Sequence, residues 1–155
     1  MKTTMLATPQ TLLDGPLGAV LLEASPGFAL VEHPIAPRTL AAPAHVHENE
    51  DEYSYVLEGE VGFEIGDEVL SAGPGQLVRK PRGIWHAFWN ATEEPARLLE
   101  VISPGGFEQY FAELAPLLHP QRDFDGLARL QAKYGLEMDF SSIERLSREH
   151  GLGTR

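Results

Sequence analysis

The chain has 155 residues, enough for one well-buried core and too few for two ordinary domains. Its formal net charge of -11 argues against a nucleic-acid partner, because binding phosphates requires a basic surface. The sequence contains no cysteine, which excludes a disulfide framework and thiolate metal ligands. Residues 1–10 lack an apolar signal-peptide core, and no apolar run approaches the ~20 residues of a membrane helix. We therefore expect a cytoplasmic protein.

Three zones follow one another along the chain, and we expect them to form a single domain. Residues 1–27 predict a lead-in region with an outer strand over 17–23 and a turn at 25–27. Residues 28–102 predict about eight short antiparallel strands without βαβ alternation, which favours an all-β jelly-roll barrel. These strands are expected at 28–33, around His45 and His47, and at 53–57, 61–65, 68–70, 76–80, 84–89 and 96–102.

Residues 103–155 predict a helical cover for the barrel, because the hydrophobic period changes there from two to 3.6. Apolar residues at 107, 110, 111, 114 and 118 mark a first helix, which Pro116 is expected to end or distort. A second helix is predicted from an N-cap at Asp125 to Gly135. A third has a predicted capping box at residues 141–144 and ends before Gly151. We expect the aromatic residues of this zone to form core or lid.

Candidate metal ligands stand first at His45 and His47. Residues two apart in a strand point to the same face, so both imidazoles can reach one ion. Glu52 lies five residues beyond His47, the wrong parity for the same straight strand, so the polar segment 48–51 must turn the chain. Residues 53–57 are rich in aromatic and β-branched residues and predict the next strand, with Glu52 at its start.

A second motif runs from Gly75 to Asn90 and supplies the third histidine, His86. Pro81 and Gly83 predict a tight turn that directs the following strand back toward the first motif. Strand alternation then places His86, Phe88 and Asn90 on one face, with residues 85, 87 and 89 on the other. Three imidazoles and one carboxylate are a ligand set for a borderline transition metal ion.

These residues resemble the two motifs of the cupins, G-x5-H-x-H-x3-4-E-x6-G and G-x5-P-x-G-x2-H-x3-N. The chain has H-x-H-x4-E-x6-G from His45 to Gly59 and every fixed position of the second motif. Thr39 stands where the first motif opens with glycine, which affects local turn geometry and not metal binding. The resemblance covers residues 28–102. Within the cupins, the chain resembles small single-domain bacterial members with a quercetin-dioxygenase-like barrel.

The resemblance implies one divalent metal ion held by His45, His47, Glu52 and His86. Four protein ligands on an ion that accepts six leave two adjacent positions for a substrate oxygen beside dioxygen or water. This favours Fe, Mn, Ni or Co, with Zn or Cu as alternatives. We expect a dioxygenase-type oxidoreductase acting on a small oxygen-chelating phenolic or enol substrate, with Glu52 as ligand and catalytic base. A non-redox isomerase, cyclase or lyase and a binding module without turnover are the alternatives.

The other candidates are pocket residues and an interface. Phe88 and Asn90 are expected beside the metal, Asn90 as a pocket or supporting residue and not as a ligand. Alternation sends either Arg79 or Lys80 inward, so the pair indicates charges at the barrel rim or a cation that selects an anionic substrate. We expect a homodimer formed through outward aromatic residues, with a small molecule as the other partner. The interface candidates are Trp85, Trp89 and Tyr55, and the histidines expected to play no part are His33, His119 and His150.

Overall fold

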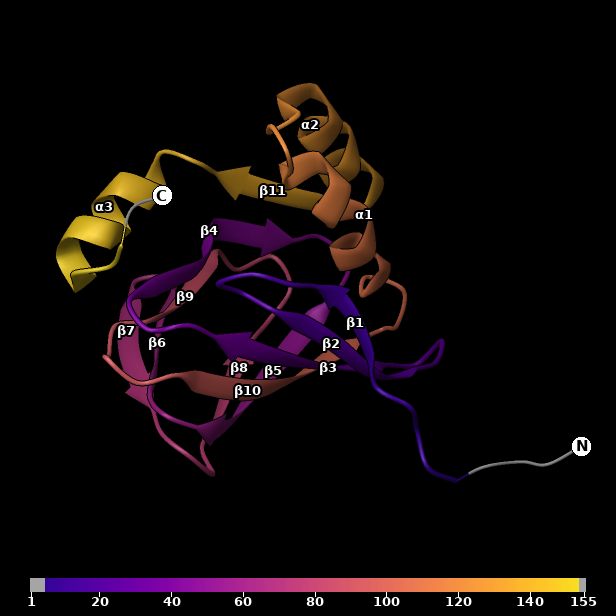
Figure 1. Ribbon diagram of the computed structural model, residues 1–155, viewed down its shortest axis with the longest axis horizontal. Coiled ribbons are helices and arrows are strands. Elements are labelled where there is room, and N and C mark those ends of the chain that lie inside the picture. The colour runs from indigo at the N-terminus through magenta and orange to yellow at the C-terminus, as the bar shows by residue number, and fades with distance from the viewer. Residues whose placement is uncertain (1–4, 154–155) are drawn as a thin grey trace, which may run out of the picture.

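A computed structural model describes residues 5–153 as a mostly β fold with two antiparallel sheets and three short helices (Figure 1). The first sheet has the order β1-β2-β3-β10-β5-β8 and the second the order β11-β4-β9-β6-β7. The first sheet contains β1 (Gln10–Leu13), β2 (Ala19–Ala24), β3 (Ala29–Ile35), β10 (Ala96–Ser103), β5 (Asp51–Glu58) and β8 (Leu77–Lys80). The second contains β11 (Leu136–Asp139), β4 (Thr39–His47), β9 (His86–Asn90), β6 (Val61–Ile65) and β7 (Glu68–Ala72).

The predicted all-β class is confirmed as a mostly β fold of two antiparallel sheets with three short helices. This arrangement is consistent with a cupin jelly roll. Closure of the sheets into a barrel stays a prediction. All eight strands expected within residues 28–102 are present, with bounds that shift by a few residues. No helix within residues 5–153 is long and apolar enough to cross a membrane.

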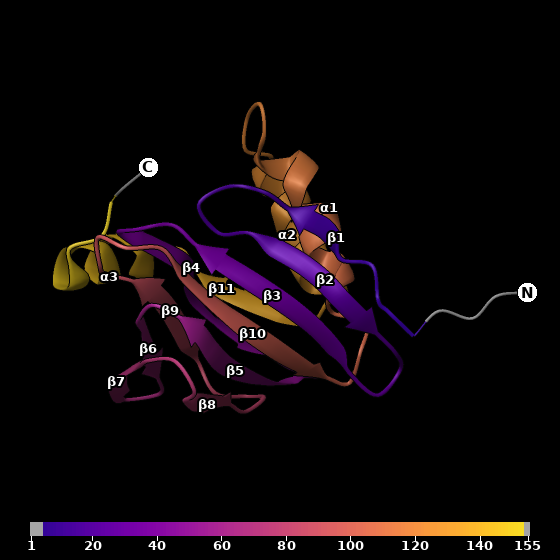
Figure 2. The same cartoon turned by 60° about the horizontal axis from the view of Figure 1, so that its bottom comes forward.

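Strands β2, β3, β10 and β5 of the first sheet lie side by side (Figure 2). In β10 every second residue is buried, and the same holds for the facing positions of β3 and β5. Most of these inward residues are apolar and form the core between the sheets with Phe63 and Phe88. The exceptions are polar side chains that surround the candidate metal centre.

Strand β9 is buried on both faces, because helix α3 (Ser142–His150) covers its outer side. Trp89 is only 3% exposed and its indole stacks on the ring of His150 at 4.0 Å between centroids. Trp89 therefore cannot serve as an outward interface residue, which corrects that part of the sequence prediction. Trp85 and Tyr55 are 39% and 40% exposed, and the homodimer itself stays a prediction.

Helices α1 (Gln109–Leu118) and α2 (Phe124–Lys133) lie together at one end of the molecule, and α3 lies at the other (Figure 1). Pro116 lies inside α1 and does not end it. The N-cap of α2 is Asp123, whose carboxylate accepts a hydrogen bond from the Gly126 N–H at 2.9 Å, and not the predicted Asp125.

The predicted capping box of α3 is also wrong. The Ser141 hydroxyl donates to the Asp139 carboxylate at 2.5 Å, so it does not cap the helix. Ser142 instead accepts from the Ala44 N–H at 2.8 Å, which fastens the start of α3 to strand β4. The helix ends as expected at Gly151, which adopts the left-handed conformation with φ 66°.

Replacing Gly62 with alanine should destabilise the fold, because a Cβ at this position of β6 would lie 2.1 Å from Nε1 of Trp89. The ring of His150 also stacks on this indole, so the indole cannot move away freely. We expect a loss of about 1–3 kcal/mol in unfolding free energy, the usual cost of overpacking. Urea unfolding followed by circular dichroism measures this.

The control is Gly73→Ala, where the nearest atom to an added Cβ is the flexible end of Gln76 at 4.0 Å. This substitution should change stability by less than about 0.5 kcal/mol. Equal unfolding midpoints for the two variants would contradict the packing described for Trp89.

Candidate metal centre

Three strands from the two sheets bring together the four predicted ligands. His45 and His47 lie on β4, Glu52 lies at the start of β5, and His86 opens β9. Strand β9 pairs with β4 so that His86 stands directly opposite His45. The turn before β9 is fixed to the ligand strand, because the Gly83 N–H donates to the His47 carbonyl at 2.9 Å. Gly83 has φ 78°, a conformation that favours glycine.

The four side chains form one buried cluster in which each offers a ligand atom within 4.8 Å of the others. None is more than 6% exposed. Oε1 of Glu52 lies 3.1 Å from Nε2 of His47 and 3.2 Å from Nε2 of His86. Oε1 of Glu52 and Nε2 of His86 nevertheless have no well-directed hydrogen bond. Converging lone pairs without hydrogen-bond partners fit a shared cation, so the donor set suits a divalent transition metal ion.

Backbone carbonyls set the orientation of two imidazoles. Nδ1 of His45 lies 2.7 Å from the Pro43 carbonyl, and Nδ1 of His86 lies 3.2 Å from the Ile84 carbonyl. A carbonyl can only accept, so both Nδ1 atoms carry the hydrogen and both Nε2 atoms keep a lone pair. Such outer contacts are how proteins fix the tautomer of a metal-binding histidine.

The electrostatics of the cluster distinguish the three imidazoles. Burial lowers the pKa of His45 and of His86, so both are neutral at pH 7. Burial also opposes a proton on His47, but the carboxylates of Glu52 and Glu50 outweigh it and raise the pKa of His47 to about 9. Burial opposes the charge of Glu52, yet His47 and Lys80 overcome it and hold the pKa of Glu52 well below its usual range. Glu52 is therefore ionised at neutral pH.

A buried lysine supports the ligand carboxylate. Lys80 is 1% exposed, and its ammonium lies 3.8 Å from Oε1 of Glu52 and 4.6 Å from the centre of the Phe88 ring. It also forms an ion pair with Glu100, whose second oxygen accepts from the Ser54 hydroxyl at 2.8 Å. Burial raises the pKa of Glu100 to about 7, against the opposing effect of Lys80.

The remaining predicted residues fall in different places. Phe88 lines the cavity beside the cluster. Lys80 points inward as a supporting residue deep in the core and not at a rim, whereas Arg79 is exposed on the outer face. Asn90 is not among the cavity residues, because its amide donates to three carbonyls and its oxygen accepts twice from Thr92. It therefore fastens the end of β9 and does not reach the metal centre.

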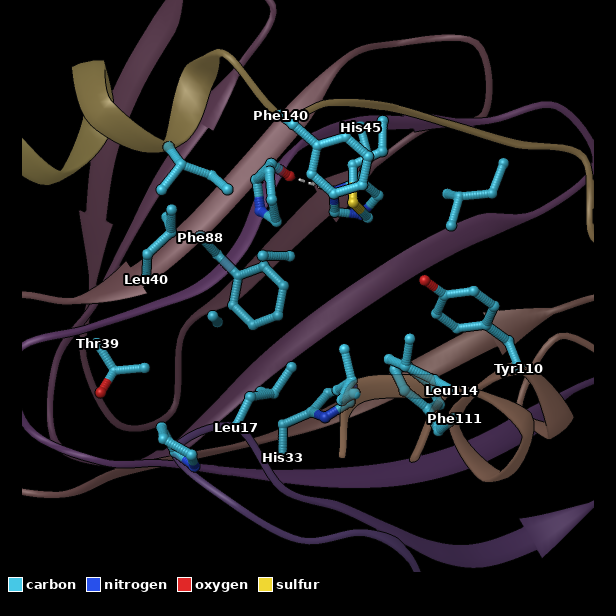
Figure 3. A pocket seen from close by; sticks show the side chains of 18 of the residues that line it. Leu17, His33, Thr39, Leu40, His45, Phe88, Tyr110, Phe111, Leu114 and Phe140 are labelled. Carbon is cyan, nitrogen blue, oxygen red and sulfur yellow. Dashed lines mark hydrogen bonds between the residues drawn. The ribbon is translucent and has the colours of Figure 1, made fainter. Parts of the chain in front are cut away.

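A cavity of about 480 Å³ lies next to the cluster, and Figure 3 shows the side chains around it. His45, His47 and Glu52 lie in its wall. The wall is otherwise mainly apolar and includes α1, α2 and the segment after β11. Two of its polar members are His33, which the sequence analysis expected to play no part, and Glu100, which it did not consider. Nothing in either strand's local pattern marks an inward polar residue as functional.

Comparison with family models matches the cupin domain at residues 32–102, a span that contains all four clustered residues. The chain belongs to the cupin superfamily. A search among curated proteins found no match.

Three solved structures illustrate the likeness of this cupin to known proteins. TT1209 from Thermus thermophilus is 31% identical with a TM-score of 0.54, covering 57% of this chain and 83% of that chain. A sugar phosphate isomerase of the cupin superfamily from Silicibacter pomeroyi is 24% identical with a TM-score of 0.53, covering 57% and 59% respectively. Streptomyces PAC13 with uridine is 15% identical with a TM-score of 0.58, covering 70% and 88%. The last two show the fold alone.

Alanine at any one of the four clustered positions should reduce metal occupancy sharply, because each removes a ligand atom from a set of four. We expect a loss of at least about tenfold in affinity for Co²⁺ or Mn²⁺, measured by calorimetry and by elemental analysis. His119→Ala, at an exposed position outside the cluster, is the control and should bind normally. Full stoichiometry in His86→Ala would show that the ligand assignment is wrong.

Metal binding should strengthen as the pH rises toward about 9. His47 has a pKa of about 9, so below that pH a metal ion must displace its proton. The apparent affinity should therefore rise about tenfold per pH unit between pH 6 and 8 and level off above 9. Calorimetry in buffers of different ionisation enthalpy should show about one proton released at pH 7. An affinity that does not change with pH would contradict this assignment.

Proposed function

We propose that this cupin is a metal-dependent oxidoreductase of the dioxygenase type that acts on a small oxygen-chelating phenolic or enol substrate. The observation that carries the proposal is the buried cluster of three histidines and one glutamate beside a largely apolar cavity of about 480 Å³. A cavity of this size accommodates a small ligand and excludes bulk water from the ligand atoms. Closure of the two sheets into a jelly-roll barrel around this cavity is part of the proposal.

The chain's own residues would hold and orient the reactants. A bound divalent ion would supply Lewis acidity and, if it is redox-active, would pass electrons from the substrate to dioxygen. His45, His47 and His86 present their Nε2 atoms to one point, and Glu52 adds an ionised carboxylate. We assign Glu52 the second task of accepting the proton of a substrate hydroxyl as that oxygen approaches.

A non-redox reaction, such as an isomerisation, cyclisation or elimination, is the second candidate. One feature of the chain favours it: the Glu100 carboxyl lies in the cavity wall, and its pKa of about 7 suits a group that gives and takes protons. Two similar structures have the names of non-redox enzymes, which supports this candidate. One is a sugar phosphate isomerase, and the other, Pac13, is a nucleoside dehydratase. A binding module without turnover is the third candidate.

An oxygen electrode separates these candidates. The purified protein is first analysed for metals and then loaded with Fe, Mn, Ni, Co, Cu or Zn. A panel of catechols, enols and ene-diols is then added in air and under argon. Dioxygen consumption that requires a redox-active metal supports the oxygenase. Turnover with zinc under argon supports the non-redox enzyme, and binding without either supports the binding module.

Replacing Glu52 with glutamine should lower turnover per bound metal ion by roughly 100-fold or more, the usual effect of removing a general base. The amide oxygen can still coordinate, so some metal is retained and the rate can be expressed per ion. The acid limb of the pH-rate profile should disappear with the carboxylate. Equal rates per ion with an unchanged acid limb would leave Glu52 as a ligand only.

The assembly and setting of the protein belong to the same proposal. We propose one domain in which residues 28–102 form the core, residues 1–27 the lead-in and residues 103–155 the cover. We also propose that it acts in the cytoplasm as a homodimer on a small molecule. Sedimentation as a monomer at tens of micromolar would contradict the dimer.

A further inference from the structure

Two polar side chains in the cavity wall take no part in the metal cluster. Tyr110 lies on α1 and His33 on β3, and both line the cavity (Figure 3). They are 5% and 2% exposed, so they are cut off from bulk solvent. The ring of Phe111 lies between them, with its centre 5.7 Å from that of Tyr110 and 5.1 Å from that of His33. Together we call Tyr110 and His33 the distal pair.

The Tyr110 hydroxyl forms no hydrogen bond with another residue among 5–153, and its oxygen is not among the fully enclosed unpaired atoms, so it is accessible from the cavity. In Figure 3 its oxygen points toward the interior of the cavity. Burial raises the pKa of Tyr110 to about 12, so the group is a neutral hydroxyl at pH 7. The neighbouring Tyr134 differs, because its hydroxyl donates to the Glu113 carboxylate and its side chain does not line the cavity. A buried tyrosine hydroxyl normally has a partner, so Tyr110 is available to a ligand.

His33 offers a second unpaired atom. Its Nδ1 lies 2.7 Å from the Gly18 carbonyl, which can only accept, so Nδ1 carries the hydrogen. Burial lowers the pKa of His33 to about 4, which leaves the imidazole neutral at pH 7. Nε2 therefore keeps a lone pair and has no hydrogen-bond partner in the described part of the chain. It can accept a hydrogen bond but cannot donate one.

An aromatic surface leads from the metal cluster to the distal pair. Phe107 contacts the metal-ligand candidate His47 at 4.5 Å between ring centres, edge to face. Phe107 also stacks on Tyr110 at 5.0 Å with the rings only 20° from parallel. A flat apolar molecule can lie along this surface with one end at the metal cluster and the other at Tyr110.

We propose that the Tyr110 hydroxyl recognises a neutral hydroxyl group, at the end of a flat apolar substrate opposite the oxygens that chelate the metal, while the neutral His33 lines the wall on the other side of Phe111. A substrate hydroxyl can accept from, or donate to, the Tyr110 hydroxyl. A carboxylate is disfavoured, because neither residue carries a positive charge and the lone pair of His33 would repel it. The orientation of the substrate rests on the proposed function, but the hydroxyl contact does not.

The experiment measures binding of matched probes by calorimetry. The chelating pair is 4-(4-hydroxyphenyl)catechol and 4-(4-methylphenyl)catechol, with 4-(4-carboxyphenyl)catechol as the charged analogue, on Co²⁺-loaded protein. The non-chelating pair is 4-phenylphenol and 4-methylbiphenyl, on wild-type protein freed of metal with EDTA. Each hydroxyl probe should bind about 3- to 10-fold more tightly than its methyl partner, as expected for one neutral hydrogen bond. The carboxylate should bind more weakly than the hydroxyl.

Tyr110→Phe should abolish the preference for hydroxyl over methyl in both pairs, because it removes only the hydroxyl oxygen. Tyr134→Phe is the matched control and should keep the preference, since its hydroxyl already bonds Glu113. A preference that survives in Tyr110→Phe, or no measurable binding by either pair, overturns the inference. If the chelating pair binds no more tightly to the Co²⁺-loaded protein than to the metal-free protein while the other pair behaves as expected, the proposed function fails and the Tyr110 contact stands.

Discussion

Burial of the Glu52 carboxylate is the constraint on which the rest of the interior depends. A buried carboxylate is costly unless charges and hydrogen bonds compensate it, and His47 and Lys80 do so here. The buried ammonium of Lys80 then needs a second anion, which Glu100 supplies, and Ser54 donates to the remaining oxygen of Glu100. Burial of this one ligand therefore requires compensating polar side chains on three strands.

The strand register makes this arrangement possible. In the first sheet Glu52 is paired with Lys80, and Ser54 with Glu100, so strand alternation turns all four toward the interior between the sheets. A shift of one residue in β8 would exchange Lys80 for Arg79 and bury a side chain that now lies on the outer face. The pairing of β8 with β5 therefore matters as much to the metal centre as the ligand motif does.

The four candidate ligands could be predicted from the sequence, because strand alternation and the Pro81-to-Gly83 turn are local signals. It could not choose between Arg79 and Lys80, since the inward residue is decided by pairing with β5, more than twenty residues away. Strand β11 was missed for a similar reason: four residues after Gly135 form a strand only because the edge of β4 is available. That pairing sets Leu136 opposite His47 and Met138 opposite His45, so the C-terminal zone also stabilises the ligand strand. Asn90 lies on the predicted face of β9, but backbone carbonyls that only the tertiary fold brings close satisfy its amide.

The two ends of the cavity differ in charge, and this difference gives the proposed site a direction. At one end an ionised carboxylate, a lysine and three imidazoles surround the candidate metal position. At the other end the tyrosine and histidine of the distal pair are neutral, because a tyrosine hydroxyl carries no charge at pH 7 and burial lowers the pKa of His33 to about 4. A substrate with acidic oxygens at one end and a neutral hydroxyl at the other satisfies both ends in only one orientation. Reversal would leave buried polar atoms unpaired at each end, and such mismatches discriminate more strongly than a change in apolar area does.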